Sequence, residues 1–109
     1  MSEAPAIVRI DRLPGNALDA AAAFHAGHLP AIRSQAPVTG LTVAILSHAP
    51  EDHDGWRLAA VQGLARELAP RRIIFLQAGD AGAEREAIDY LAAAPGVTGQ
   101  YLKLEPVSA

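Results

Sequence analysis

Hydrophobic residues in this chain form three short runs, which are separated by long alanine-rich stretches. The first covers residues 6–10, and the other two, over residues 41–46 and 73–76, are continuous and do not alternate with polar residues. Unbroken runs of this length are typical of strands that are buried on both faces, as in a parallel sheet. The stretches over residues 16–35 and 54–69 are long enough to be helices, so predicted strands and helices alternate along the chain.

The predicted helix boundaries support the same interpretation. Asn16 and Asp54 open the two long stretches with side chains that are well suited to cap a helix. A third helix is predicted over residues 84–94, where Pro95-Gly96 ends it, and a last strand follows. The order β-α-β-α-β-α-β predicts an α/β fold of about four parallel strands, with right-handed crossovers and helices on both faces of the sheet.

Length and composition narrow the possible functions. The chain has 109 residues, which predicts a single domain over residues 1–109. A net charge of -3 and the lack of a basic cluster argue against a nucleic-acid or anionic-membrane partner. The absence of cysteine excludes disulfides and cysteine-ligated zinc. We find no signal peptide or transmembrane span in the sequence and therefore expect a cytoplasmic protein.

Several segments resemble the motifs of one known family, in the same order. They are the helix over residues 18–32, the strand Thr42-Val43-Ala44-Ile45-Leu46-Ser47, the helix over 59–70, the strand over 72–79, the helix end Asp89-Tyr90-Leu91-Ala92 and the strand over 97–105. Together they resemble the second half of the short-chain dehydrogenase/reductases. The resemblance implies a truncated, half-Rossmann domain, and the dinucleotide-binding half of the family is not in this chain.

The resemblance also implies that catalytic residues have been lost. Ser47 falls on the family's catalytic serine, but the Tyr-Lys pair that performs acid-base catalysis from one helix face has no counterpart. One alignment puts Asp54 and Leu58 at the Tyr and Lys positions, and another puts Pro50 and Asp54 there. Ala17 falls where a catalytic asparagine would stand, and no Gly-x-Gly-x-x-Gly occurs. The resemblance therefore predicts no enzyme activity and no bound cofactor, and it leaves Ser47 as a remnant.

The loops after the second and third strands are candidate ligand sites, because open α/β sheets bind ligands at the carboxyl ends of their strands. The candidate residues are Ser47, His48, Gly79, Asp80 and Gly82. Residues 78–82 could form an anion-binding nest, although a turn that needs a glycine with positive φ is the simpler interpretation. The family's substrate lid is expected to be reduced to residues 80–85.

The four histidines raise the hypothesis of a metal site. His25 and His28 lie three residues apart on a predicted helix. The loop after the second strand holds the other candidate ligands, which are His48, Glu51, Asp52 and His53. A zinc site needs three or four convergent ligands, and no His-Glu-x-x-His motif is present. Solvated or locally hydrogen-bonded side chains are the simpler interpretation, so we predict no metal.

The two long helices carry more apolar surface than one sheet can cover. On the helix over 54–69, one stripe suits the sheet and a second stripe of small residues predicts another packed face. The predicted interface residues are Phe24, Trp56, Ala59, Ala60, Gly63 and Glu67. For Trp56, an ordinary place in the core is an equally good interpretation. We expect a two-fold homodimer through both helices, and an exposed sheet edge at residues 6–10 that Pro5 and Arg9 partly protect.

These observations favour a non-catalytic protein, similar to short-chain dehydrogenases, that acts by association and most simply with itself. Three alternatives stay open. The chain could bind a small ligand at the strand ends, regulate a full-length dehydrogenase by docking on it, or complete an oxidoreductase site with a partner chain. Thermal shifts with ligands, copurification with a dehydrogenase and turnover restored by a partner would distinguish the three.

Overall fold

A computed structural model describes residues 4–35 and 40–105 of the protein. Its four strands lie in one parallel sheet in the order β1-β2-β3-β4. They are β1 (Ala6–Ile10), β2 (Leu41–Leu46), β3 (Arg72–Gln77) and β4 (Gln100–Lys103). The three hydrophobic runs therefore predicted the first three strands correctly, and the predicted α/β fold with four parallel strands is confirmed.

Helical segments connect the consecutive strands. They are α1 (Ala17–Ala23), the π-helical turn η1 (Phe24–His28), α2 (Leu29–Gln35), the 3-10 turn η3 (Glu51–His53), α3 (Asp54–Leu68) and α4 (Ala81–Ala92). Asn16 caps α1 as predicted, since its side chain accepts a hydrogen bond from the Asp19 N–H. Asp54 is not a cap, because η3 precedes it and makes it the first residue of α3. None of the described helices is long and apolar enough to cross a membrane.

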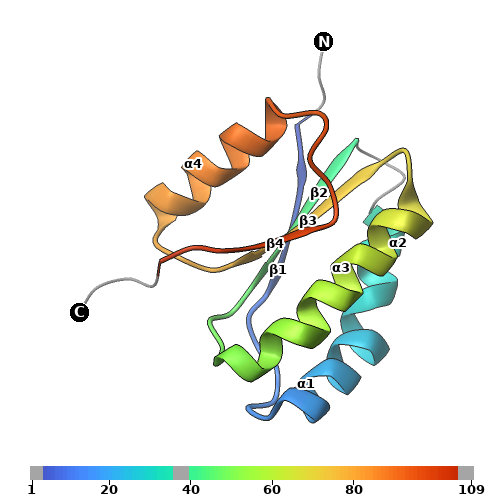
Figure 1. Cartoon of the computed structure of the whole chain (residues 1–109), viewed down its shortest axis with the longest axis vertical. Helices are drawn as coiled ribbons and strands as arrows, with labels where there is room; N and C mark the ends of the chain where they lie inside the picture. The colour runs from blue at the N-terminus through green and yellow to red at the C-terminus, as the bar shows by residue number, and fades with distance from the viewer. Residues whose placement is uncertain (1–3, 36–39, 106–109) are drawn as a thin grey trace.

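The helices cover the two faces of the sheet unequally. Figure 1 shows α1, α2 and α3 together on one face and α4 alone on the other. The core under α1, α2 and α3 contains Ile10, Phe24, Ile32, Ala44, Leu46, Val61, Leu64, Ile73 and Phe75. The core under α4 contains Leu41, Val43, Ile45, Ile74, Leu76 and Leu91. Because β2 and β3 contribute to both cores, their hydrophobic runs show no alternation.

The three connections between strands do not all have the same hand. The strands advance in one direction across the sheet, so a connection on one face has the opposite hand to a connection on the other. The two connections through α1–α2 and α3 are right-handed, as nearly all such connections are. The connection from β3 through α4 to β4 is therefore left-handed. Our expectation of right-handed crossovers throughout is wrong here, because a hydrophobic pattern does not specify which face a helix will cover.

Strand β1 is an edge strand of the sheet, as expected for residues 6–10. Ile7 on this strand is 41% exposed. Arg9 crosses from the strand to α4, where its guanidinium contacts the Glu84 carboxylate at 2.6 Å. A charged residue on an edge strand discourages pairing with another chain, so Arg9 gives the edge part of the protection predicted from the sequence.

Candidate functional site

A buried polar cluster lies at the carboxyl ends of β2 and β3. Its centre is Arg57 on α3, which is only 1% exposed. Its Nη1 donates a hydrogen bond to the Tyr101 hydroxyl at 3.0 Å. That hydroxyl donates in turn to Oε1 of Gln77 at 3.4 Å, and the Ala49 N–H reaches the same oxygen at 3.4 Å. The cluster therefore links α3, β4, β3 and the loop after β2 through hydrogen bonds.

Arg57 has no negatively charged partner in the described part of the chain. No carboxylate oxygen there lies within 4.0 Å of its nitrogens. Its Nε is buried and makes no hydrogen bond. The guanidinium carbon lies 5.5 Å from the ring centroid of Trp56 and 5.8 Å from that of Tyr101, so ring contacts supply part of its environment.

His53 lies beside this cluster and is 2% exposed. The indole Nε1–H of Trp56 donates to His53 Nδ1 at 3.3 Å, and His53 Nε2 lies 3.0 Å from the carbonyl oxygen of Gly15. An indole nitrogen can only donate and a carbonyl oxygen can only accept, so these partners assign the histidine proton to Nε2. The ring thereby connects α3 to the loop after β1.

A cavity of about 90 Å³ opens among these groups. It is lined by Leu13, Pro14, Gly15, Ser47, His48, Ala49, Pro50, His53 and Arg57. The structure therefore brings the predicted residues Ser47 and His48 together with Arg57, which the sequence did not single out. Gly79, Asp80 and Gly82 do not line this cavity.

The positions aligned with the family's Tyr-Lys pair hold side chains of other chemistry. Asp54 accepts a hydrogen bond from Lys103 Nζ at 2.9 Å, and this bond raises the pKa of Lys103 above its usual value. Leu58 is 41% exposed, and Pro50 is also exposed. Neither alignment places a phenol and an amine on one helix face here, which is what the family's acid-base chemistry requires.

The loop after β3 differs from the glycine-rich turn expected there. Asp80 caps α4 by accepting a hydrogen bond from the Ala83 N–H at 2.8 Å, and the helix begins at Ala81. Among the described residues, Gly99 is the glycine with positive φ, so the expected positive-φ turn at residues 78–82 is wrong. Gly79 is needed for another reason, because a Cβ there would lie 2.9 Å from the Glu105 carbonyl oxygen. The reduced lid expected over residues 80–85 is instead the start of α4.

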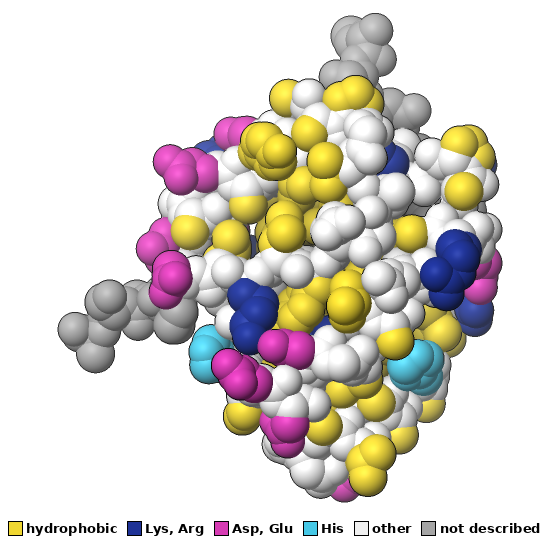
Figure 2. All heavy atoms as spheres, in the orientation of Figure 1, with side chains coloured by type: hydrophobic (Ala, Val, Ile, Leu, Met, Phe, Trp, Pro, Cys, Tyr) yellow, Lys and Arg dark blue, Asp and Glu magenta, His cyan; other side chains and the backbone are white. Residues whose placement is uncertain are grey.

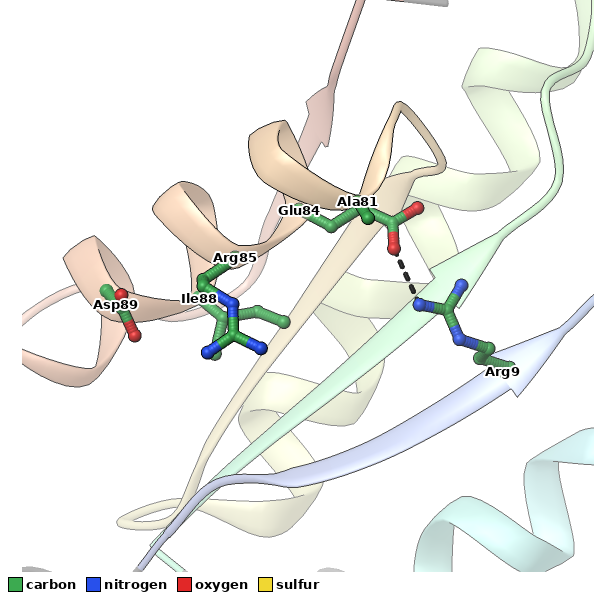
Figure 3. A pocket seen from close by; sticks show the side chains of 6 residues that line it. All are labelled: Arg9, Ala81, Glu84, Arg85, Ile88 and Asp89. Carbon is green, nitrogen blue, oxygen red and sulfur yellow. Dashed lines mark hydrogen bonds and ion pairs between the residues drawn. The ribbon is translucent and has the colours of Figure 1, made fainter. Parts of the chain in front are cut away.

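A second buried charge, on α4, has its partners. Glu84 is 6% exposed and accepts hydrogen bonds from Arg9 at 2.6 Å and from the Gly79 N–H at 3.2 Å. The hydrogen bond to Glu84 raises the pKa of Arg9 above its usual value. Figure 3 shows Arg9 reaching from β1 toward Glu84, at the rim of a pocket of about 320 Å³ that Arg85 and Asp89 also line.

The predicted interface residues fall into two groups. Phe24 is 0% exposed and lies in the core of the chain itself, so its side chain is not available to a partner. Trp56 is half-buried and packs on Phe24 at 5.3 Å between ring centroids. The other four, Ala59, Ala60, Gly63 and Glu67, line a groove of about 240 Å³ between α3 and the η1–α2 segment. Arg33 forms two 2.7 Å hydrogen bonds with Glu67, and the bond lowers the pKa of Glu67.

The histidines are not brought together. No group of three or more metal-ligating side chains is found within residues 4–35 and 40–105. His25 contacts the Ala21 carbonyl oxygen at 2.7 Å, and the His28 ring stacks on Phe24. His48 is exposed at the end of β2, whereas His53 is buried.

Arg57 is the residue that our sequence interpretation missed, although a signal for it exists. It precedes Val61 by four residues and Leu64 by seven, so it continues the helical stripe that faces the sheet. Arginine on such a stripe is uncommon, because an arginine is rarely buried unless it is paired. A search for charged residues on predicted buried faces would have found it.

The comparisons with known proteins identify the family of the chain. The family described as short chain dehydrogenase-like protein (SDR-like) matches residues 8–104. The match runs from within β1 to just beyond β4 and includes every helix between them. No curated protein and no solved structure matches the chain. With its parallel sheet and with nearly all of its length in the family match, the chain belongs to the short chain dehydrogenase-like family.

Proposed function

We propose that this protein is a non-catalytic member of its family that acts by association, with a second copy of itself as the partner. The contact surface is the side of α1, η1, α2 and α3 that faces away from the sheet, here called the outer helical surface. The observation that carries the proposal is the groove on this surface, which is lined by Ala59, Ala60, Gly63 and Glu67.

The absence of catalysis is supported by the side chains at the positions aligned with the family's Tyr-Lys pair. General acid-base catalysis requires a donor or acceptor within hydrogen-bonding reach of the reacting atom. Asp54 is already paired with Lys103, and the exposed Leu58 and Pro50 carry no titratable group. Ser47 therefore has no partner comparable to the family's Tyr-Lys pair.

Association is supported by glycines that the chain itself does not require. A Cβ added at Gly63 would have no atom within 4 Å, and the same holds at Gly55 and Gly27. A glycine inside a helix costs roughly 0.5–1 kcal/mol relative to alanine, so these positions are unfavourable for the monomer. Close approach of a second backbone would explain why glycine, and not a better helix former, occupies these positions. In Figure 2, hydrophobic and uncharged side chains occupy most of the surface over α1 and α3, with charged groups toward its ends.

Light scattering at roughly 50 μM tests the association, because a stable interface of about 1,200–2,000 Å² commonly gives a dissociation constant at or below the micromolar range. We expect a dimer for the natural protein and a monomer for Gly63→Glu, which places a charge in the groove. Gly96→Glu is the matched control, since Gly96 also has open space but lies outside the outer helical surface. A natural protein that is monomeric at this concentration would contradict the proposal.

Gly63→Ala separates association from simple folding. Because a Cβ at this position has open space within the chain, the monomer should gain stability from the better helix former. The dimer should weaken, because the methyl group keeps the two backbones apart. A variant that becomes more stable and dimerises as well as the natural protein would show that Gly63 is not at the interface.

Titration calorimetry with NADH and NADPH tests the absence of dehydrogenase chemistry in the isolated 109-residue chain. We expect no binding tighter than about 100 μM. Tight binding of either nucleotide would contradict the non-catalytic proposal, while the light-scattering result would stand independently.

A further inference from the structure

We propose that the cavity beside Arg57 binds a small oxyanion, a monocarboxylate or inorganic phosphate, that pairs with the buried guanidinium. This inference does not depend on dimerisation, because the cavity lies at the carboxyl ends of the strands and the groove between the helices is lined by different residues.

The first argument is the charge of Arg57. A buried charge is normally paired, because an unpaired one has lost its hydration without compensation. Arg57 is 1% exposed, has no carboxylate within 4.0 Å among the described residues and leaves Nε without a hydrogen bond. Its partners are a phenolic hydroxyl and two aromatic rings, none of which carries a negative charge.

The second argument is the position of Arg57 in its helix. It is the fourth residue of α3, at the end where the unpaired N–H groups create a partial positive charge. A cation is therefore unfavourable at this end, and the same field favours an anion. An oxyanion in the cavity would be attracted by both the guanidinium and the helix end.

The third argument is the size and lining of the cavity. At about 90 Å³ it has the volume of roughly three molecules of liquid water, which suits an anion of acetate or phosphate size. The Ser47 hydroxyl at the wall can donate to an anionic oxygen, and a guanidinium is a planar donor that matches carboxylate and phosphate. The cavity thus offers positive charge, donors and a limited size in one place.

The single tryptophan provides a direct readout, because its ring centroid lies 5.5 Å from the Arg57 guanidinium carbon. The experiment titrates acetate, inorganic phosphate and, as an oversized anion, citrate, with chloride keeping the ionic strength constant. We expect saturable changes in Trp56 fluorescence with acetate or phosphate and none with citrate. At about ten times the dissociation constant, the melting temperature should rise by roughly 4 °C or more.

Arg57→Met is the main control, because it keeps the volume of the side chain and removes its charge. Sulfate and phosphate stabilise many proteins without a specific site, so only the difference between the natural protein and this variant is informative. We expect the variant to lose the saturable response to both anions. An equal thermal shift in the two proteins would overturn the proposal, as would a fluorescence change that does not saturate.

Two further variants test the competing explanation that Asp54 supplies the counter-charge. Oδ1 of Asp54 is buried without a hydrogen bond, and Asp54 is three residues before Arg57 on α3. If the cavity binds an anion, Asp54→Asn should bind acetate or phosphate at least as tightly as the natural protein, and loss of binding would overturn the proposal. Ser47→Leu should block binding by filling the cavity while Arg57 stays charged, and unchanged binding in a folded variant would contradict the site.

Discussion

Glu84 and Arg57 occupy equivalent positions on the two faces of the sheet and have opposite environments. Each is the fourth residue of the helix that follows a strand, α4 after β3 and α3 after β2. Each is buried near the carboxyl ends of the strands. Glu84 has a cation and a backbone N–H as partners, whereas Arg57 has neutral partners and a free Nε.

The helix ends increase this contrast. The positive end of a helix stabilises a carboxylate and destabilises a guanidinium, so α4 supports Glu84 while α3 opposes Arg57. Glu84 is therefore a closed structural site, complete within the chain. Arg57 is an open site, which lacks the negative partner that its burial requires. A buried charge should be interpreted by its partners and not by its burial alone.

Removing Glu84 is expected to have the largest effect. Glu84→Ala deletes two charge-assisted hydrogen bonds and leaves the Gly79 N–H without its acceptor, so the free energy of unfolding should fall by about 3 kcal/mol. Urea unfolding measures the loss. Glu86→Ala, at an exposed position two residues further along α4, is the control and should change stability by less than about 0.5 kcal/mol. A similar result for both variants would remove the distinction between closed and open sites.

Gly79→Ala should have the next largest effect, because it disturbs the same closed site through the backbone. The new Cβ would lie 2.9 Å from both the Glu105 carbonyl oxygen and the Leu104 Cβ, so the segment that follows β4 or the loop after β3 must shift. We expect a loss of about 2 kcal/mol in urea unfolding, typical of an overpacked site. Gly96→Ala is the control, because a Cβ there meets no atom within 4 Å, and it should change stability by less than about 0.5 kcal/mol. If Gly79→Ala is not destabilising, the close approach of residues 104 and 105 is not a constraint.

Arg57→Met should have the opposite sign to Glu84→Ala. Replacing an uncompensated buried charge by an apolar side chain of similar size is neutral or stabilising, so we expect a gain of about 1 kcal/mol in buffer that contains only chloride. Adding acetate or phosphate should reduce the difference by stabilising the natural protein alone. A loss of more than about 1 kcal/mol in chloride would show that Tyr101 and Trp56 compensate Arg57, which would then be as closed as Glu84.

The sequence predicted the strands and helices that carry Glu84 and Arg57, but not that these two charged residues would be buried. The strands were predictable because both of their faces are buried, which leaves Thr42 as the one polar residue of β2 and puts the polar residues of β3 at its two ends. The start of α4 was placed too late, at Glu84, because Ala81 and Gly82 resemble a loop. Once Asp80 is identified as the cap, Glu84 lies in the first turn, where a carboxylate is common.

The partners of the two residues depend on contacts between distant parts of the chain. Arg9 and Glu84 are separated by 75 positions, and Arg57 and Tyr101 by 44. Such pairs are set by the order of the strands and by the face that each helix covers. The left-handed connection through α4 was not predictable from hydrophobic pattern, and it is this connection that puts Glu84 on the same face as Arg9.

The ion pair between Arg33 and Glu67 is an exposed reference for the two buried sites, and it should have the smallest effect. The hydrogen bond from Arg33 lowers the pKa of Glu67, so any contribution to stability is present above the unfolded-state pKa, near 4.5, and is lost as the pH falls through the lower folded-state value. Arg33→Met should therefore raise the titration midpoint of the Glu67 carboxyl carbon in NMR. Its small destabilisation at pH 7 should decrease as the pH falls below the unfolded-state pKa. Because solvent screens exposed pairs, the change at pH 7 should be far smaller than for Glu84→Ala. A comparable loss would mean that partners, and not burial, determine how strongly a charge in this fold contributes to stability.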